Sequence, residues 1–253
     1  MAPADGFVVV QRYSNTSLTP GSVRLPISMA SPDGRLLSDG PDTVSGSIRN
    51  EAGDGVAAVS ADKHGVDMVQ TYWPLTFELD EPGFYFLDLE GAIGEPVSFQ
   101  IFESSEVALP VVGSRLAGFD TPTTDDARGV DPICTRSPDP CPFHEVTLTE
   151  ALESGKPVVY LIGTPAHCAT GTCAPGLEYL MEAAPTYGDD VVFVHAEVYA
   201  DNAATERAPA VAAAKLEYEP VIFVTDAQGT VVERIDIIWD GPDLDGLLGR
   251  ALS

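Results

Sequence analysis

The first hundred residues alternate between apolar and polar positions in short runs, as half-buried β-strands do. Residues 75–79 and 97–102 alternate most regularly. A turn signal of Asp, Glu, Pro and Gly at residues 80–83 joins the first of these runs to the apolar residues 84–89, which predicts a β-hairpin. Three further strands are predicted at residues 7–10, 23–29 and 44–49. No helical periodicity competes with this interpretation.

Several short strands at this spacing predict an antiparallel β-sandwich that resembles immunoglobulin-like domains. We therefore expect residues 1–108 to form an all-β, immunoglobulin-like domain. This part of the sequence holds no combination of side chains typical of a catalytic site.

Residues 109–143 change character, because six prolines interrupt them. This composition predicts an extended, proline-rich linker that is semi-rigid where the prolines cluster. Cys134 and Cys141 close a short loop in this linker, and we expect them to form a structural disulfide. The alternative is a second redox pair that relays electrons to Cys168 and Cys173.

From residue 144 onward, strands alternate with helices, so this part is expected to be an α/β domain. A strand at residues 144–148 opens it, and Thr147 with Glu150 forms a capping box that begins a short helix. The remaining predicted elements are strands at residues 157–162, 191–196, 220–224 and 231–238, and helices beginning at Pro175, spanning residues 203–216 and spanning residues 242–252.

This order of elements, with a cysteine pair between the second strand and its helix, resembles the thioredoxin-like superfamily. The resemblance covers residues 144–253 and implies that Cys168 and Cys173 are redox-active and that Pro220, at the start of the fourth strand, is cis and faces them. The chain departs from the family in two respects. Four residues separate the cysteines, where thioredoxins have two, and His167 stands where a tryptophan usually precedes the first cysteine.

The chemistry of thiol–disulfide exchange assigns roles to this pair. Cys168 precedes a helix, whose N-terminus favours a thiolate together with a protonated His167, so we expect Cys168 to attack and Cys173 to resolve the mixed disulfide. Residues five apart in a helix are separated by about 7.5 Å along the axis, whereas a disulfide holds its Cα atoms roughly 4.4–6.8 Å apart. Residues 169–172 must therefore loop out, and Gly171 supplies the backbone freedom for that loop.

The chain carries 13 basic and 39 acidic residues, a net charge of −26, and the acidic excess is spread along its length. Such a chain is repelled by phosphate backbones, so nucleic-acid binding is excluded. We find no zinc-binding spacing and expect neither a metal nor a cofactor. Two other functions stay open: a non-catalytic thioredoxin-fold binding or scaffold protein, and a copper-binding chaperone similar to the Sco type.

An even number of cysteines fits disulfides in an extracytoplasmic compartment, whether secreted, periplasmic or at the cell surface. No apolar run approaches the roughly 20 residues of a membrane span, and residues 1–5 do not resemble a secretion signal. We expect any signal or membrane-tethering segment to lie outside this chain. The expected partner is a protein that supplies a thiol or a disulfide.

Overall fold

The computed structural model describes residues 6–253, so residues 1–5, which we examined for a secretion signal, lie outside the described residues. The chain divides into two compact units, Met1–Ala108 and Leu109–Ser253. Its regular structure is mostly strand, with eleven strands in three sheets and four α-helices in the described part. Across residues 6–253, no helix has the length and apolar character needed to cross a membrane.

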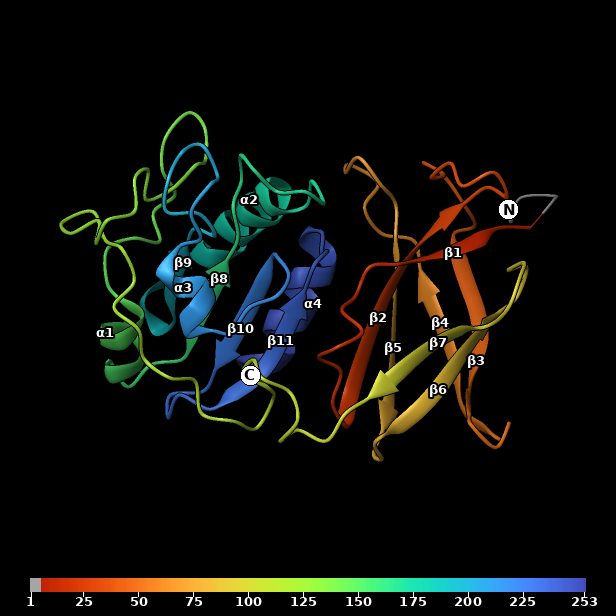
Figure 1. Cartoon of the computed structure of the whole chain (residues 1–253). Coiled ribbons are helices and arrows are strands. Elements are labelled where there is room, and N and C mark those ends of the chain that lie inside the picture. Colours follow the sequence, from red (N-terminus) through yellow and green to blue (C-terminus); the bar gives the residue numbers. More distant parts are fainter. Residues whose placement is uncertain (1–5) are drawn as a thin grey trace. The chain divides into compact units, whose positions relative to one another are not determined.

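The N-terminal unit consists of two antiparallel sheets around one hydrophobic core (Figure 1). One sheet has the order β1 (Val8–Gln11), β2 (Gly21–Ala30), β5 (Trp73–Leu79), and the other has the order β4 (Gly55–Asp62), β3 (Thr43–Asn50), β6 (Gly83–Leu89), β7 (Val97–Ile101). Trp73 and Leu25 from the first sheet and Ile48 and Leu87 from the second are almost fully buried in this core. The alternation in the sequence therefore reflects strands with one face in the core.

Strand β4 was not predicted from the sequence. Its apolar residues are mostly alanines, and Val56 on it is 43% exposed, so the strand lacks the regular alternation of its neighbours. β4 lies at the edge of its sheet and pairs with β3 alone. An edge strand of this kind is specified by its pairing more than by its own hydrophobic pattern.

A hydrogen bond from Tyr85 fixes the corner before β6. The Tyr85 hydroxyl donates to the carbonyl oxygen of Glu81 at 2.9 Å, and its ring stacks on Phe99 in the core. We expect Tyr85→Phe to lower the free energy of unfolding by about 1 kcal/mol, since the ring stays and one hydrogen bond is lost. Urea unfolding of the full chain measures this, and an unchanged midpoint would contradict it.

The C-terminal unit is built on a mixed four-stranded sheet of order β11 (Val231–Asp236), β10 (Val221–Thr225), β8 (Val158–Ile162), β9 (Val192–Ala196). β9 runs parallel to β8, whereas β10 runs antiparallel to both β8 and β11. Every residue of β8 and of β10 is buried. Their continuous apolar runs are what strands covered on both faces require.

Helices cover both faces of this sheet (Figure 1). α2 (Cys173–Ala183) and α4 (Gly241–Ala251) pack on the face that presents Val159 and Ile222. α1 (Leu148–Glu153) and α3 (Pro209–Ala213) lie on the face that presents Tyr160. The capping box that begins α1 is present, because the Thr147 hydroxyl accepts from the backbone of Glu150 and the Glu150 carboxylate accepts from that of Thr147.

Residues 109–143 are not an extended linker. They belong to the C-terminal unit, although they contain no helix or strand. Val111, Leu116, Val130 and Phe143 are each less than 10% exposed. These apolar residues are isolated in the sequence and show no periodicity, so the prolines around them led to the wrong prediction.

Two further predictions were wrong. Residues 144–148 are not a strand: the carbonyl of His144 accepts from Thr124, and Thr147 already caps α1, which leaves too few residues for a ladder. The alanine-rich residues 203–216 are helical only in α3. The Asp201 carboxylate accepts hydrogen bonds from the N–H groups of residues 203, 205 and 206, and these local bonds compete with the helix.

Candidate functional site

A disulfide joins Cys168 and Cys173 in the loop between β8 and α2, with Cα atoms 5.9 Å apart. The intervening residues loop out as expected. Gly171 has φ +70°, and its N–H donates to the carbonyl oxygen of Cys168 at 3.2 Å. The wide spacing of the pair is therefore compatible with a closed bond at the start of the helix.

The two sulfurs differ in exposure. Cys173 is the first residue of α2 and is 2% exposed, whereas Cys168 lies in the loop and is partly exposed. The Cys173 backbone N–H donates to Cys168 Sγ at 3.2 Å, so the helix N-terminus points at the outer sulfur. α2 begins two residues earlier than predicted, which places Pro175 third in its first turn, where a missing N–H is tolerated.

The Glu219–Pro220 peptide bond is cis, and Pro220 lies beside the disulfide. Gly163, directly after β8, separates Pro220 from Cys173. A Cβ atom on Gly163 would lie 3.3 Å from Cβ of Pro220 and 3.7 Å from Cβ of Cys173. This contact needs a glycine, because the rigid proline ring leaves little room for a side chain.

A carboxyl group that was not predicted as part of the site lies next to the disulfide. Glu219 Oε2 is 3.7 Å from Cys173 Sγ. Burial, followed by the nearby charge of Glu197, raises the pKa of Glu219 to about 7. Its position next to the predicted cis proline was the one signal in the sequence that could have identified it.

Glu197 is the buried neighbour of Glu219 and is 1% exposed. Its Oε1 accepts hydrogen bonds from the N–H of Thr135 at 2.6 Å and from the Thr135 hydroxyl at 2.9 Å. The same hydroxyl accepts from the N–H of Ala166 at 3.1 Å, in the loop that carries Cys168. Thr135 thus connects the proline-rich segment to the disulfide loop and to Glu197.

His167, the residue before Cys168, contacts an aromatic ring. Its ring packs edge-on against Tyr199, with ring centroids 6.1 Å apart. In the part of the chain that the structure describes, the hydrogen bonds of the Cys168 sulfur are with the Thr170 hydroxyl and the Cys173 backbone N–H. The N-terminus of α2 is thus the group that contacts the Cys168 sulfur directly, and the expected effect of His167 on the thiolate stays a prediction.

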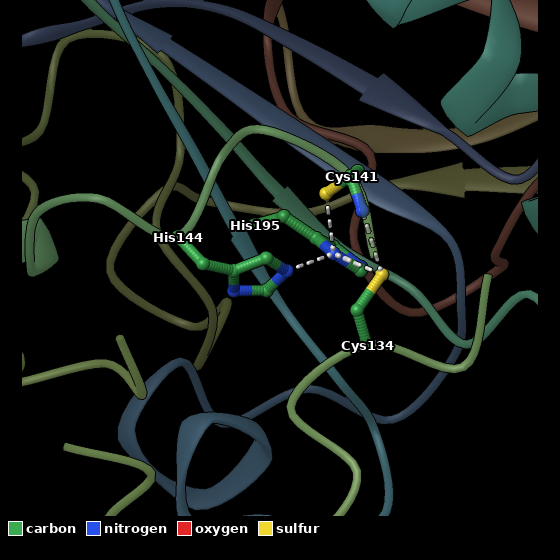
Figure 2. A group of neighbouring side chains, drawn as sticks. All are labelled: Cys134, Cys141, His144 and His195. Atoms are coloured by element: carbon green, nitrogen blue, oxygen red, sulfur yellow. Dashed lines mark hydrogen bonds between the residues drawn. The ribbon is translucent and has the colours of Figure 1, made fainter. Parts of the chain in front are cut away.

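Cys134 and Cys141 are free thiols in the structure, not the predicted disulfide. Both are buried beside His144 and His195 (Figure 2). His195 Nδ1 lies 3.7 Å from Cys134 Sγ, 3.4 Å from Cys141 Sγ and 3.1 Å from His144 Nε2. Both sulfurs therefore lie within hydrogen-bond distance of the same histidine nitrogen.

The hydrogen bond with Cys141 is the largest cause that lowers the pKa of the Cys134 thiol far below its ordinary value. The histidines of the cluster act in the same direction, while the pKa of the Cys141 thiol is raised. The cluster was not predicted from the sequence, because its histidines lie 51 residues apart. The available signal was the spacing of Cys134, Cys141 and His144, with two residues between the last two.

No protein-family model and no curated protein matches this chain. Among solved structures, the chain is similar to the crystal structure of a thiol:disulfide interchange protein, a thioredoxin family protein from Chlorobium tepidum TLS. The two sequences are 16% identical, and the TM-score is 0.39. The match covers 56% of this chain and 99% of the other chain.

Proposed function

We propose that the C-terminal unit is a thioredoxin-like domain that exchanges thiols and disulfides with a partner protein. One observation carries the proposal: a partly exposed sulfur at a helix N-terminus is bonded to a buried sulfur that has a carboxyl group of raised pKa beside it. A disulfide that only stabilised the fold would need neither the helix end nor the carboxyl group.

In this proposal a partner thiolate attacks Cys168 Sγ, because that sulfur is the accessible one. A bond forms between the partner sulfur and Cys168, and the Cys168–Cys173 bond breaks with its electron pair on Cys173. A second partner thiolate then attacks the partner sulfur of the mixed disulfide, and Cys168 leaves as a thiolate. The partner dithiol is oxidised to a disulfide and the cysteine pair is reduced; the reverse sequence reduces a partner disulfide.

Glu219 is the proton carrier of this scheme. With a pKa of about 7, it holds a proton in part of the molecules at neutral pH and can give it to the Cys173 thiolate at 3.7 Å. In the reverse direction its carboxylate takes the proton from Cys173, and the resulting thiolate attacks Cys168 Sγ. A pocket lined by residues including Tyr199, Arg207 and Glu219 lies next to this group and offers the partner chain a place to dock.

The donor atoms near the disulfide do not favour the copper hypothesis. Reduced Cys168 and Cys173 would be joined by the Glu219 carboxylate, a hard oxygen ligand, whereas Cu(I) prefers soft sulfur ligands. The scaffold hypothesis is tested by turnover. We expect the wild-type chain to accelerate insulin reduction by dithiothreitol, and a rate equal to that of the reagent alone would support the scaffold.

We also propose that the N-terminal unit is immunoglobulin-like. Its two antiparallel sheets have the strand orders β1-β2-β5 and β4-β3-β6-β7. Two antiparallel sheets packed face to face are the architecture of immunoglobulin-like sandwiches. The bond from the Tyr85 hydroxyl back to Glu81 has the form of the tyrosine corner of these domains. We place the whole chain outside the cytoplasm, where an accessible disulfide persists. Trapping free thiols in intact cells with an impermeant reagent tests this location.

A further inference from the structure

We infer that Cys134, Cys141, His144 and His195 bind one Zn²⁺ ion as a closed, structural site. The four ligand atoms lie within 4.8 Å of one another and come from two distant parts of the sequence (Figure 2). Three of the ligands lie in residues 134–144, at the end of the proline-rich segment, and His195 comes from β9. This site is separate from the exchange site, and the inference does not depend on the proposed function.

The distances from His195 Nδ1 to the other three ligand atoms match those of a tetrahedral zinc site. Zinc binds thiolate sulfur at about 2.3 Å and imidazole nitrogen at about 2.0–2.1 Å, so tetrahedral ligands are separated by about 3.6 Å for sulfur to nitrogen and about 3.3 Å for nitrogen to nitrogen. The observed separations from His195 Nδ1 are 3.7 and 3.4 Å to the two sulfurs and 3.1 Å to His144 Nε2. The three separations from His195 Nδ1 thus match those of a tetrahedral site, and all four ligand atoms lie within 4.8 Å of one another.

The surroundings of the ligands prepare them for a metal. His195 Nε2 lies 3.1 Å from the carbonyl oxygen of Gly163, an acceptor that requires the proton on Nε2. Nδ1 then carries its lone pair into the cluster. The N–H of Cys141 lies 3.4 Å from Cys134 Sγ and donates to it, an outer-shell bond that stabilises a thiolate ligand.

Burial decides between a structural and a catalytic ion. The exposed fractions of the four residues are 3%, 4%, 1% and 0%, so no coordination position opens to solvent. Two thiolates would balance the charge of Zn²⁺, and the cost of burying an unpaired charge is thereby avoided. Closed sites with two cysteines and two histidines are typical of structural zinc.

The position of the site in the fold indicates a structural role for the ion. Residues 109–143 contain no helix or strand, yet they are packed against the sheet. A zinc ion held by Cys134, Cys141 and His144 on one side and by His195 on the other would fasten this segment to β9. Metal binding would then contribute directly to the stability of the C-terminal unit.

The test is the metal content of the full chain, purified under reducing conditions with Zn²⁺ present. We expect one equivalent of zinc in the wild type and one equivalent in the Cys168→Ser/Cys173→Ser control, whose serines lie outside the cluster. We expect Cys134→Ser and His195→Ala to lose the zinc. A Cys134–Cys141 disulfide in zinc-supplied protein, or zinc retained by both cluster variants, would overturn the inference.

Cobalt substitution keeps the test valid if the cluster variants fail to fold. Chelated wild-type protein titrated with Co²⁺ alone should develop the intense visible bands of a tetrahedral site and a sulfur-to-cobalt charge-transfer band, saturating at one equivalent. Subsequent Zn²⁺ should abolish these bands. A weak, octahedral spectrum with no charge-transfer band would show that the thiols do not bind the metal.

Discussion

Cys168→Ser is expected to reduce thiol–disulfide exchange to the uncatalysed rate, whereas Cys173→Ser should accumulate a mixed disulfide with the partner. The difference follows from exposure. Cys168 is partly exposed and receives the N–H of Cys173, while Cys173 is 2% exposed at the start of α2. Attack needs the outer sulfur, and release of the partner needs the inner one.

Two measurements separate these outcomes. Insulin reduction gives the rate of exchange, and non-reducing electrophoresis of extracts incubated with each variant shows the trapped partner. The Cys168→Ser/Cys173→Ser chain is the matched control, because it has the same fold but no thiol in the loop and should trap nothing. If both single variants reduce insulin at the wild-type rate, the disulfide is a structural bridge and the scaffold hypothesis holds.

Glu219→Gln is expected to slow the resolving step about 100-fold at neutral pH, at the lower end of the range of general acid–base catalysis. The amide cannot take a proton from Cys173. The wild-type resolving rate should rise between about pH 6 and 8, because burial raises the pKa of Glu219 to about 7, and this rise should be missing in the variant. Single-turnover reduction of a partner disulfide across this pH range measures the effect.

Although Glu219→Gln should slow the resolving step, it should increase the free energy of unfolding at alkaline pH. A carboxyl group whose pKa is raised by folding stabilises the protein below its unfolded pKa of about 4.5, and this contribution is lost as the pH rises through about 7. Glu219→Gln should therefore be more stable than the wild type at pH 8, and the two should be equal near pH 4. Because solvent screens the partly exposed group, the gain should be about 2 kcal/mol.

Glu182→Gln is the control for both measurements, since Glu182 is exposed on α2. It should leave the rate and the pH profile unchanged. A Glu219→Gln variant with the wild-type pH profile would remove Glu219 from the mechanism, and would leave the roles of the two cysteines unaffected.

The parts of the fold that sequence predicted well are those with a strong local pattern. The alternation in β5 and β7, the continuous apolar runs of β8 and β10, and the capping box at Thr147 each determine one element by themselves. The cysteine pair of the exchange site was found in the same way, because Cys168 and Cys173 lie close together in the sequence.

The features that were missed depend on contacts between distant residues. Glu219 is an ordinary glutamate until folding buries it beside Cys173, 46 residues away. His195 joins Cys134 across 61 residues, and a histidine in an apolar strand gives no sign of this. The proline-rich residues 109–143 showed no periodicity, so their packing against the sheet could not be inferred from hydrophobic pattern.

Thr135 gives the two cysteine sites a common element. It follows Cys134 directly, its hydroxyl bonds to Glu197 and to the N–H of Ala166, and Glu197 in turn raises the pKa of Glu219. Coupling through such a shared residue is reciprocal. If zinc binding changes the equilibrium constant for reduction of the Cys168–Cys173 disulfide by some factor, reduction of the disulfide must change the zinc affinity by the same factor. A reduction potential that shifts with zinc would show that Thr135 couples the two sites, and an unchanged potential would show that it does not.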